Sequence, residues 1–349
     1  MRRGRHLARV LLPLAVMLLA VACGEGENQV SKREREPALE LTGRMLTTGG
    51  FRDPAMQIHD FAADTTERVL LPGNPEVVDA FWSESGDVAY VLAEGAATGS
   101  FLEILPDGRV RRLGEALPGF ANTGDLGGSH LLATLCQQKE PSVIVMDVET
   151  GKWNEVAPGC GGSLAPDGEE VVYSPDDRTL WTIAASGRGH ARKIADLADL
   201  TGVEPEEVSR ARIESIDWGD GGIALEVSIE DRLLAVLVDE GGDPEAIAGD
   251  PGVNELDFTW QPGGDRLAVA TFSSAFNDAE AVIRMIDADR REAQVVAIDP
   301  SRFFNMTWSP EGDYLVATTS KGRWLFADAA GNWLTSEHFI TAGTIDWAP

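Results

Sequence analysis

The sequence is dominated by one recurring hairpin motif: a strand that ends in an aromatic residue, a tight turn, and a second, apolar strand. The clearest copy runs Trp308-Ser-Pro-Glu-Gly-Asp and continues into Tyr314-Leu-Val-Ala. A turn glycine marks six copies, at positions 86, 128, 168, 222, 264 and 312. One hairpin alone is marginally stable in water, but copies spaced by about 40 to 54 residues indicate a repeat architecture in which neighbouring units cover one another.

A second hairpin recurs in the same phase as the first. Val143–Asp147 leads through an Asp/Gly turn to Trp153, and Trp324–Asp328 leads in the same way to Trp333. Two hairpins per period make a four-stranded antiparallel blade. The sequence therefore predicts an all-β fold, a β-propeller of four-stranded antiparallel blades.

The two ends of the chain complement each other. Residues 343–349 copy the first half of the marker hairpin and stop where its second strand should begin. Residues 39–71 supply three strands of a blade without a first strand. We expect the C-terminal strand to complete the N-terminal blade, which gives seven blades over residues 39–349 and closes the ring without an exposed sheet edge.

The turn sequences carry a family resemblance. W-S-P-E-G-D at Trp308, W-S-E-S-G-D at Trp82 and A-P-D-G at Ala165, each followed by an apolar strand, resemble the turns of TolB-type and WD-repeat-like β-propellers. The resemblance covers roughly residues 39–349. It implies the propeller fold, which hosts many functions, and the seven expected blades depart from the six of the TolB translocation protein.

The first residues have the features of an export signal. Four arginines precede an apolar run over residues 10–22 that is too short to span a bilayer as a permanent helix. The run ends Leu-Ala-Val-Ala-Cys23, which resembles the lipobox of bacterial lipoproteins and implies cleavage before Cys23 and attachment of acyl chains such as palmitate to it. An ordinary secretory signal or an uncleaved anchor is the alternative.

Three segments follow from this resemblance: a signal peptide at residues 1–22, a lipidated cysteine with a polar, flexible tether at 23–38, and the propeller at 39–349. We expect an extracytoplasmic monomer, attached to the cell membrane by its N-terminal lipid. Loss of the four arginines would take the formal charge of −28 to −32. Such a surface repels nucleic-acid phosphates, so the sequence predicts no nucleic-acid partner.

Two cysteines remain in the propeller, Cys136 and Cys160. Outside the cytoplasm an even pair predicts a disulfide, and closing a loop of about 25 residues would contribute about 3 kcal/mol to stability. Two buried free thiols are the alternative. Neither cysteine is a candidate nucleophile, because no histidine or basic cluster adjoins it in the sequence.

The strand before each marker aromatic should line the axis of the propeller. Alternate positions of this strand are small or polar, and the third copy places Thr123 at one of them. The acidic members of the set are Asp79, Asp217, Asp257 and Asp346. Hydrogen bonds around a water-filled channel explain them, and a Ca²⁺ site in the channel is the alternative.

The insertions that lengthen the period fall between the hairpins, and therefore open on the face opposite the tight turns. We call this side the long-loop face, and binding residues commonly lie on such loops. Its candidate contact residues are Phe51, Arg52, Gln137, Lys139, Phe272, Phe276, Arg302, Phe303, Phe304 and Lys321. The longest insertion, residues 196–212, predicts a short helix from Glu204 that either covers the channel or lies on the rim.

The sequence contains no G-x-S-x-G elbow, no H-E-x-x-H, no P-loop and no G-x-G-x-x-G opening a helix. It therefore offers no catalytic residue. We expect a non-enzymatic module that binds a protein, a peptide or an envelope component on the long-loop face. The alternative is a propeller enzyme or small-ligand receptor that uses the central channel, such as a metal-dependent lactonase. A purely structural envelope component is a third option.

Overall fold

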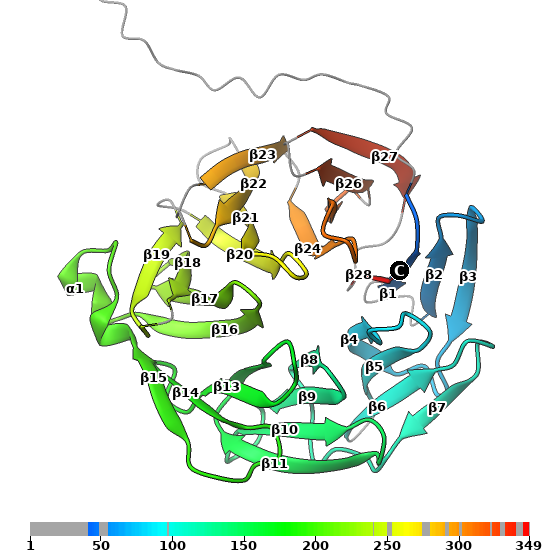
Figure 1. Cartoon of the computed structure of the whole chain (residues 1–349), viewed down its shortest axis with the longest axis horizontal. Coiled ribbons are helices and arrows are strands. Elements are labelled where there is room, and N and C mark those ends of the chain that lie inside the picture. The colour runs from blue at the N-terminus through cyan, green and yellow to red at the C-terminus, as the bar shows by residue number, and fades with distance from the viewer. Residues whose placement is uncertain are drawn as a thin grey trace, which may run out of the picture. The chain divides into compact units, whose positions relative to one another are not determined.

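Seven four-stranded antiparallel sheets follow one another around a ring in the computed structural model (Figure 1). The prediction of an all-β, seven-bladed propeller is confirmed. The structure describes residues 41–48, 55–95, 98–239, 241–249, 253–273, 280–289, 293–299, 302–321, 323–328, 332–339 and 345–348. No helix in these ranges is long and apolar enough to cross a membrane.

Each blade runs from an innermost strand at the axis to an outermost strand at the rim. Blade 1 consists of β28 (Ile345–Ala348), β1 (Arg44–Thr48), β2 (Ala55–Asp60) and β3 (Thr65–Leu70). Blade 2 consists of β4 (Glu76–Trp82), β5 (Ala89–Glu94), β6 (Gly99–Ile104) and β7 (Val110–Leu113). Blade 3 consists of β8 (Thr123–Gly127), β9 (His130–Leu135), β10 (Ser142–Asp147) and β11 (Lys152–Pro158).

Blades 4 to 7 repeat this order. Blade 4 consists of β12 (Gly161–Leu164), β13 (Glu170–Ser174), β14 (Thr179–Ala184) and β15 (Arg192–Asp196), and blade 5 of β16 (Arg212–Gly219), β17 (Gly222–Ile229), β18 (Arg232–Val238) and β19 (Pro244–Ala248). Blade 6 consists of β20 (Val253–Trp260), β21 (Arg266–Ser273), β22 (Glu280–Asp287) and β23 (Ala293–Asp299). Blade 7 consists of β24 (Phe303–Trp308), β25 (Tyr314–Thr319), β26 (Arg323–Asp328) and β27 (Trp333–Phe339).

The marker glycines make the turn between the first two strands of a blade. Gly312 has φ +71°, a left-handed conformation that favours glycine, and its N–H donates to the Ser309 carbonyl at 2.8 Å. Gly86 and Gly168 repeat this conformation. In blade 6 the positive φ falls one residue earlier, on Gly263. The recurring glycine is therefore a requirement of the turn.

The C-terminal strand closes the ring as predicted. β28 pairs with β1, with Trp347 opposite Met45. The indole N–H of Trp347 donates to the Thr42 carbonyl at 2.9 Å, and its ring lies 5.1 Å from that of Phe61 and 6.2 Å from that of Phe326, measured between centroids. Since Phe326 belongs to blade 7, Trp347 joins the first and last blades.

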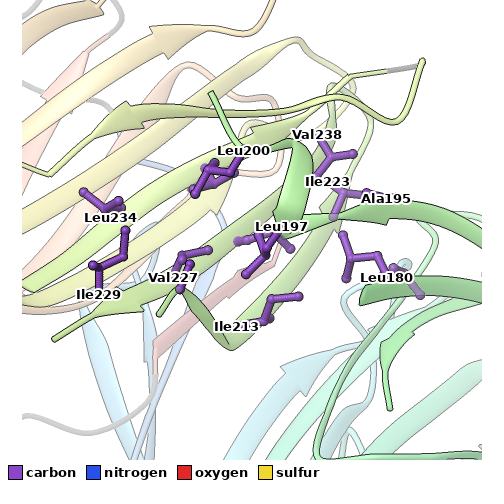
Figure 2. Close-up of a cluster of buried hydrophobic side chains, with 14 residues drawn as sticks. Leu180, Ala195, Leu197, Leu200, Ile213, Ile223, Val227, Ile229, Leu234 and Val238 are labelled. Atoms are coloured by element: carbon purple, nitrogen blue, oxygen red, sulfur yellow. The ribbon is translucent and has the colours of Figure 1, made fainter. Parts of the chain in front are cut away.

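Apolar side chains fill the space between neighbouring blades. Figure 2 shows one such cluster, in which Leu180 of blade 4 packs with Ile213 and Val227 of blade 5. Trp82, Trp260, Trp308 and Trp347, all in the marker position, are buried in comparable clusters. The repeated tryptophan is thus a packing residue between blades.

The long insertion between blades 4 and 5 lies on the rim. It contains the 3-10 helix η1 (Leu197–Asp199) and the predicted short helix, α1 (Pro205–Val208), at the outer edge of the ring in Figure 1. Arg178 donates to the Val208 and Ala211 carbonyls at 3.2 and 2.9 Å. Leu197 is buried in the cluster between blades 4 and 5. These contacts hold the insertion at the rim, so it does not cover the channel.

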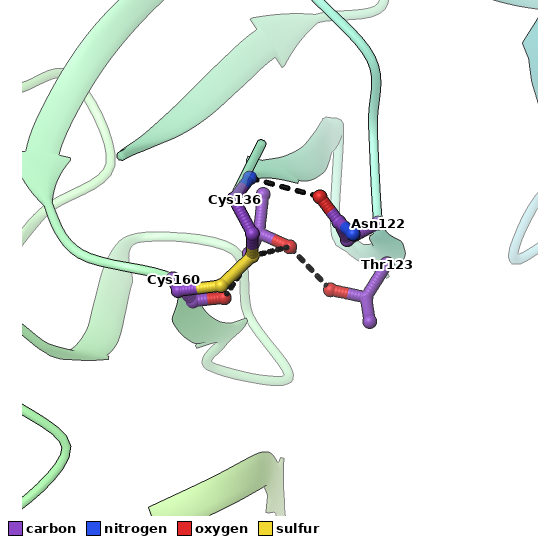
Figure 3. Close-up of a disulfide and its surroundings, with 5 residues drawn as sticks. Asn122, Thr123, Cys136 and Cys160 are labelled. Carbon is purple, nitrogen blue, oxygen red and sulfur yellow. Dashed lines mark hydrogen bonds between the residues drawn. A yellow bond between two sulfur atoms is a disulfide. The ribbon is translucent and has the colours of Figure 1, made fainter. Parts of the chain in front are cut away.

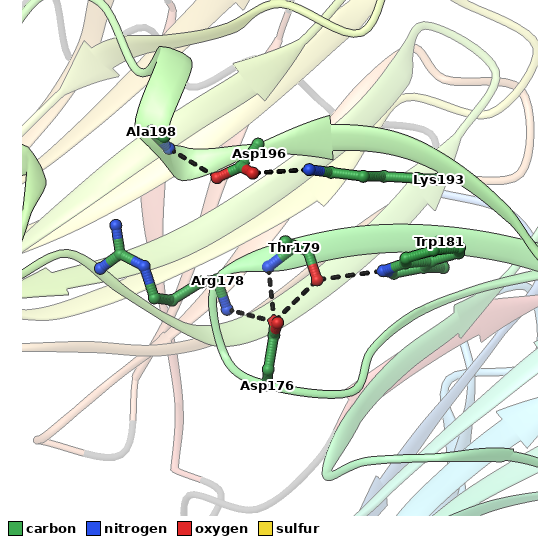
Figure 4. A network of polar contacts seen from close by, with 7 residues as sticks. All are labelled: Asp176, Arg178, Thr179, Trp181, Lys193, Asp196 and Ala198. Atoms are coloured by element: carbon green, nitrogen blue, oxygen red, sulfur yellow. Dashed lines mark hydrogen bonds and ion pairs between the residues drawn. The ribbon is translucent and has the colours of Figure 1, made fainter.

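Short-range polar contacts fix the chain on either side of this insertion (Figure 4). The Asp176 carboxylate accepts hydrogen bonds from the Arg178 and Thr179 N–H groups at 3.0 and 2.8 Å. Asp196 accepts from the Ala198 N–H, at 2.8 Å, and from the Lys193 ammonium, at 2.6 Å. The Asp196 contact caps η1. Both carboxylates act as turn and cap acceptors, which is a structural role.

The predicted disulfide between Cys136 and Cys160 is present (Figure 3). Cys136 follows β9 and Cys160 precedes β12, so the bond ties blade 3 to blade 4. The Cys136 N–H donates to the Asn122 side-chain oxygen at 2.8 Å. A closed loop with a sequence separation of 24 residues is expected to contribute about 3 kcal/mol, mainly by restricting the unfolded chain.

Candidate functional site: a carboxyl-lined central channel

All seven innermost strands line a central cavity of about 340 Å³. Consecutive residues of each innermost strand contribute to the wall, as Asp79, Ala80 and Phe81 of β4 do. The carboxyl groups that line the cavity at depth are Asp79, Asp125, Asp217, Asp257 and Asp346. The structure thus brings together the four acidic residues predicted for the channel and adds a fifth.

Sequence reasoning missed Asp125 because it misplaced the register of blade 3. It put Thr123 immediately before the marker position, but Asp125 pairs with Leu132 of β9 as Asp217 pairs with Ala224 of β17. The marker position of blade 3 therefore holds Leu126 where other blades have tryptophan. The signal was the dipeptide Asp125-Leu126 before paired glycines, in the place of an Asp-Trp dipeptide.

The channel carboxylates connect neighbouring blades through backbone N–H groups. One oxygen accepts from the residue that follows the aspartate, and the other accepts from the innermost strand of the next blade. The interblade contacts are Asp346 Oδ2 with Trp82 N (2.7 Å), Asp125 Oδ2 with Leu164 N (2.7 Å) and Asp257 Oδ2 with Met306 N (3.1 Å). In blade 4 Ser163 replaces the carboxylate, and its hydroxyl accepts from Trp218 N at 3.0 Å.

Four of the channel carboxyls fall into two groups by their pKa. Burial raises the pKa of Asp79 to about 8, opposed by the Ala80 and Gly124 N–H groups and reinforced by nearby Asp125 and Asp346. Burial likewise raises the pKa of Asp217 to about 8, and repulsion from Asp125 and Asp257 adds to it. Only one backbone N–H, that of Trp218, opposes this second shift.

Asp257 and Asp346 form the second group, in which the pKa is raised less. Burial raises the pKa of Asp257 to about 6, and the N–H groups of Phe258 and Met306 oppose the rise. Burial also raises the pKa of Asp346 to about 6, opposed by hydrogen bonds from the Trp82 and Trp347 N–H groups and the Thr307 hydroxyl. Repulsion from neighbouring carboxyls, which adds to the rise at Asp79 and Asp217, is not among the causes that act on these two.

At neutral pH the channel therefore holds protonated and ionised carboxyls side by side. Asp125, whose own pKa is raised by burial, acts on both Asp79 and Asp217. Asp346 in blade 1 acts further on Asp79 in blade 2, and Asp257 in blade 6 acts further on Asp217 in blade 5. Each pair combines a proton donor with a proton acceptor. Pairs of carboxyls whose pKa values are set apart by their surroundings are the arrangement that general acid–base sites use.

The channel does not offer the donor set that a calcium site needs. In the ranges that the structure describes, no group of three or more His, Cys, Asp or Glu side chains is placed to hold a metal ion. The carboxylate oxygens of Asp346, Asp125 and Asp257 are instead engaged by backbone N–H groups. Calcium prefers six to eight oxygen ligands, so these residues do not fit the ion.

A side chamber opens from the channel between blades 6 and 7. This cavity of about 340 Å³ shares Asp257 and Asn305 with the lining of the channel. Three of the candidate contact residues, Phe272, Arg302 and Phe303, meet around it. The Arg302 guanidinium pairs with Glu255 and lies 5.3 Å from the Phe272 ring centroid, while Phe303 is buried.

The other candidate contact residues lie elsewhere. Gln137 and Lys139 are exposed in the connection between β9 and β10, and Lys321 is exposed in the connection between β25 and β26. None of the three lines the channel or the side chamber. Phe51, Arg52 and Phe276 lie outside the described residues, and Phe304 belongs to β24 but its side chain is not described.

The fold is similar to that of several solved propellers. A candidate 6-phosphogluconolactonase from Bacteroides uniformis matches with a TM-score of 0.60 and 14% identity, over 88% of this chain and 99% of that chain. An oligogalacturonate lyase in complex with manganese matches with a TM-score of 0.56 and 13% identity, over 84% and 85% of the two chains. The Swd1 β-propeller domain from Myceliophteria thermophila matches with a TM-score of 0.54 and 14% identity, over 76% and 87%.

No protein-family model matches the sequence, and no curated protein matches it either. At identities of 13–14% the similar structures show the propeller fold alone. They support the seven-bladed propeller and leave the TolB-type resemblance and the lipobox as sequence-based predictions.

Proposed function

We propose that the protein is a propeller enzyme whose central channel carries out acid–base chemistry on a small, oxygen-rich substrate. The observation that carries this proposal is the pairing of carboxyls with different pKa values in one cavity, Asp79 with Asp346 and Asp217 with Asp257. The side chamber adjoins the channel through Asp257 and Asn305. It would accommodate the part of the substrate that does not react.

The chemistry follows from the protonation states at neutral pH. Asp79 holds a proton that it can donate to a carbonyl or leaving-group oxygen, and the Asp346 carboxylate can accept one from the attacking water or from the substrate. The backbone N–H groups fix both carboxyls in the channel wall. The names of the similar structures make sugar lactones and oligogalacturonates the first substrates to test.

Turnover is expected to follow a bell-shaped pH profile. It should fall below about pH 6 as Asp346 is protonated and above about pH 8 as Asp79 loses its proton. Asp79→Asn should lower kcat by about 100-fold or more, because it removes the proton donor. The measurement is ring opening of sugar lactones and release of unsaturated oligogalacturonate products by the wild type and the variant.

A matched control is available in the marker turn of blade 7. Asp313 is exposed there, so Asp313→Asn should leave the profile and kcat unchanged. Failure of the wild type to turn over either substrate class would contradict the proposed substrates. An Asp79→Asn variant that kept the full rate and the same profile would contradict the role of the channel.

We also propose that the protein acts outside the cytoplasm, held at the membrane through acylated Cys23. The support is the resemblance of residues 19–23 to a lipobox, preceded by a basic and an apolar segment. A Cys23→Ala variant should leave the membrane fraction, as judged by fractionation and by loss of labelled palmitate. A variant that stayed membrane-bound and migrated unchanged would contradict the anchor.

A further inference from the structure

A third cavity, of about 170 Å³, lies between blades 1 and 2 on the tight-turn face. Its walls come from the start of β1, the turn between β2 and β3, the end of β4 and the turn between β6 and β7. None of its residues lines the channel or the side chamber. It is therefore a separate site, independent of the proposed enzyme function.

Opposite charges face this cavity without pairing. Arg44 lines it together with Asp60, Glu67 and Asp87. The Arg44 guanidinium donates to the Gly86 carbonyl, and among the residues that the structure describes no ion pair joins it to any of these three carboxylates. The remaining guanidinium donors and the carboxylates thus lie around a common space.

Trp82 lines the same cavity, but its indole nitrogen is closed off from solvent. Trp82 is 6% exposed and its indole N–H has no hydrogen-bond partner. Two of its counterparts do have partners, since Trp308 donates to the Thr259 carbonyl and Trp347 to the Thr42 carbonyl. A buried unpaired donor costs about 1–3 kcal/mol, and the Arg44 guanidinium carbon lies 4.8 Å from the Trp82 ring centroid.

Trp260 also has an unpaired indole N–H, but its surroundings differ. Its ring packs directly on the backbone of Gly219 and Gly221, where an added Cβ would lie within 2.4 Å of it. It lines none of the three cavities. Trp82 differs from Trp260 in that it lines a cavity and lies against the Arg44 guanidinium.

We propose that this cavity binds a small free α-amino acid in its zwitterionic form. The ligand carboxylate would accept hydrogen bonds from the Arg44 guanidinium, as arginine favours carboxylates. The ligand ammonium would lie against Asp60, Glu67 and Asp87. One bound zwitterion satisfies both charged sides, which neither a simple anion nor a simple cation does.

The size of the cavity limits the ligand. Sites for drug-sized molecules are about 300–1,000 Å³, whereas this space of about 170 Å³ corresponds to roughly six water molecules. An amino acid with a short side chain, such as alanine or serine, matches it. Glu67 and Asp87 are exposed, so the ligand has a route in from solvent.

Isothermal titration calorimetry of the full chain with each free amino acid tests the proposal. We expect saturable binding of one or more small amino acids, and binding at least about tenfold weaker for ethylamine or propionate, which each lack one charged group. Arg44→Gln and Glu67→Gln should each weaken binding at least about tenfold. Because Glu67 is exposed, its substitution keeps the fold and the test remains valid if Arg44→Gln is unstable.

Two controls separate this cavity from its surroundings. Glu84→Gln alters an exposed acid in the neighbouring turn, and Asp79→Asn alters the channel; both should bind the amino acid as the wild type does. The proposal is overturned if no amino acid saturates, if ethylamine or propionate binds equally well, or if Glu67→Gln binds like the wild type. Loss of binding in Asp79→Asn would overturn it too, since the ligand would then occupy the channel.

Discussion

Raising the pH from about 5 to about 7 is expected to lower the free energy of unfolding by roughly 4 kcal/mol through Asp79 and Asp217 together. In the folded protein both carboxyls keep their proton until about pH 8, because burial raises their pKa. In the unfolded chain they lose it near the ordinary aspartate pKa of 3.8. Between these values the folded state binds more protons at Asp79 and Asp217, so the stability that these two carboxyls contribute is greatest at low pH and falls as the pH rises.

The magnitude follows from about 1.4 kcal/mol per pH unit for each carboxyl. Both residues are only partly buried, and solvent screening reduces this to roughly 2 kcal/mol each over two pH units. Asp79→Asn should remove about half of the effect. The amide oxygen of the asparagine can still accept the Ala80 N–H, and the variant should be more stable than the wild type at pH 7.

Urea denaturation at a series of pH values measures this directly. Comparison with Asp313→Asn, an exposed aspartate of the marker turn, corrects for the general effect of removing one negative charge. The exposed variant should keep the pH dependence of the wild type. An Asp79→Asn variant with the same pH dependence as the wild type would mean that Asp79 titrates normally and that the channel holds no protonated carboxyl.

Trp347→Ala is expected to lower the free energy of unfolding by about 4 kcal/mol. Trp347 is 5% exposed, and it donates to the Thr42 carbonyl at 2.9 Å. Its ring contacts Phe61 and Phe326, which connects blade 1 to blade 7. Truncation would leave a cavity where the ring closes, as well as an unpaired carbonyl.

Thermal or urea unfolding of this variant should be compared with that of Trp153→Ala. Trp153 lies in the outermost strand of blade 3 and is only half-buried, so we expect a loss of about 1 kcal/mol there. The hydrogen-exchange protection of β1 and β28 should fall in Trp347→Ala and not in Trp153→Ala. Equal destabilisation by the two substitutions would show that closure through β28 adds nothing beyond ordinary tryptophan burial.

The fold was predictable because its determinants are local and repeated. The turn around Gly312 needs a left-handed glycine, and the marker tryptophan packs between adjacent blades, so both recur wherever a blade recurs. The closure through β28 could be inferred from an incomplete hairpin at each end of the chain. The pairing of Cys136 with Cys160 was likewise predicted, with free thiols as the alternative, and is confirmed.

The site was only partly predictable, because its properties depend on neighbours in other blades. Asp125 was missed since its blade lacks the marker tryptophan. The pKa difference between Asp79 and Asp346 depends on burial and on backbone donors of the next blade, which no local pattern encodes. The cavity around Arg44 and Trp82 combines four separate turns and strands that share no period in the sequence.

Carbon-13 NMR titration of the aspartate carboxyls tests the central claim most directly. The resonances of Asp79, Asp217, Asp257 and Asp346 would be assigned by their loss in the corresponding Asp→Asn variants. We expect two carboxyls, Asp79 and Asp217, to titrate near pH 8, and Asp257 and Asp346 to titrate near pH 6. If all four titrated together near pH 4, as exposed aspartates do, the channel would hold no proton donor at neutral pH and the proposed acid–base site would be wrong.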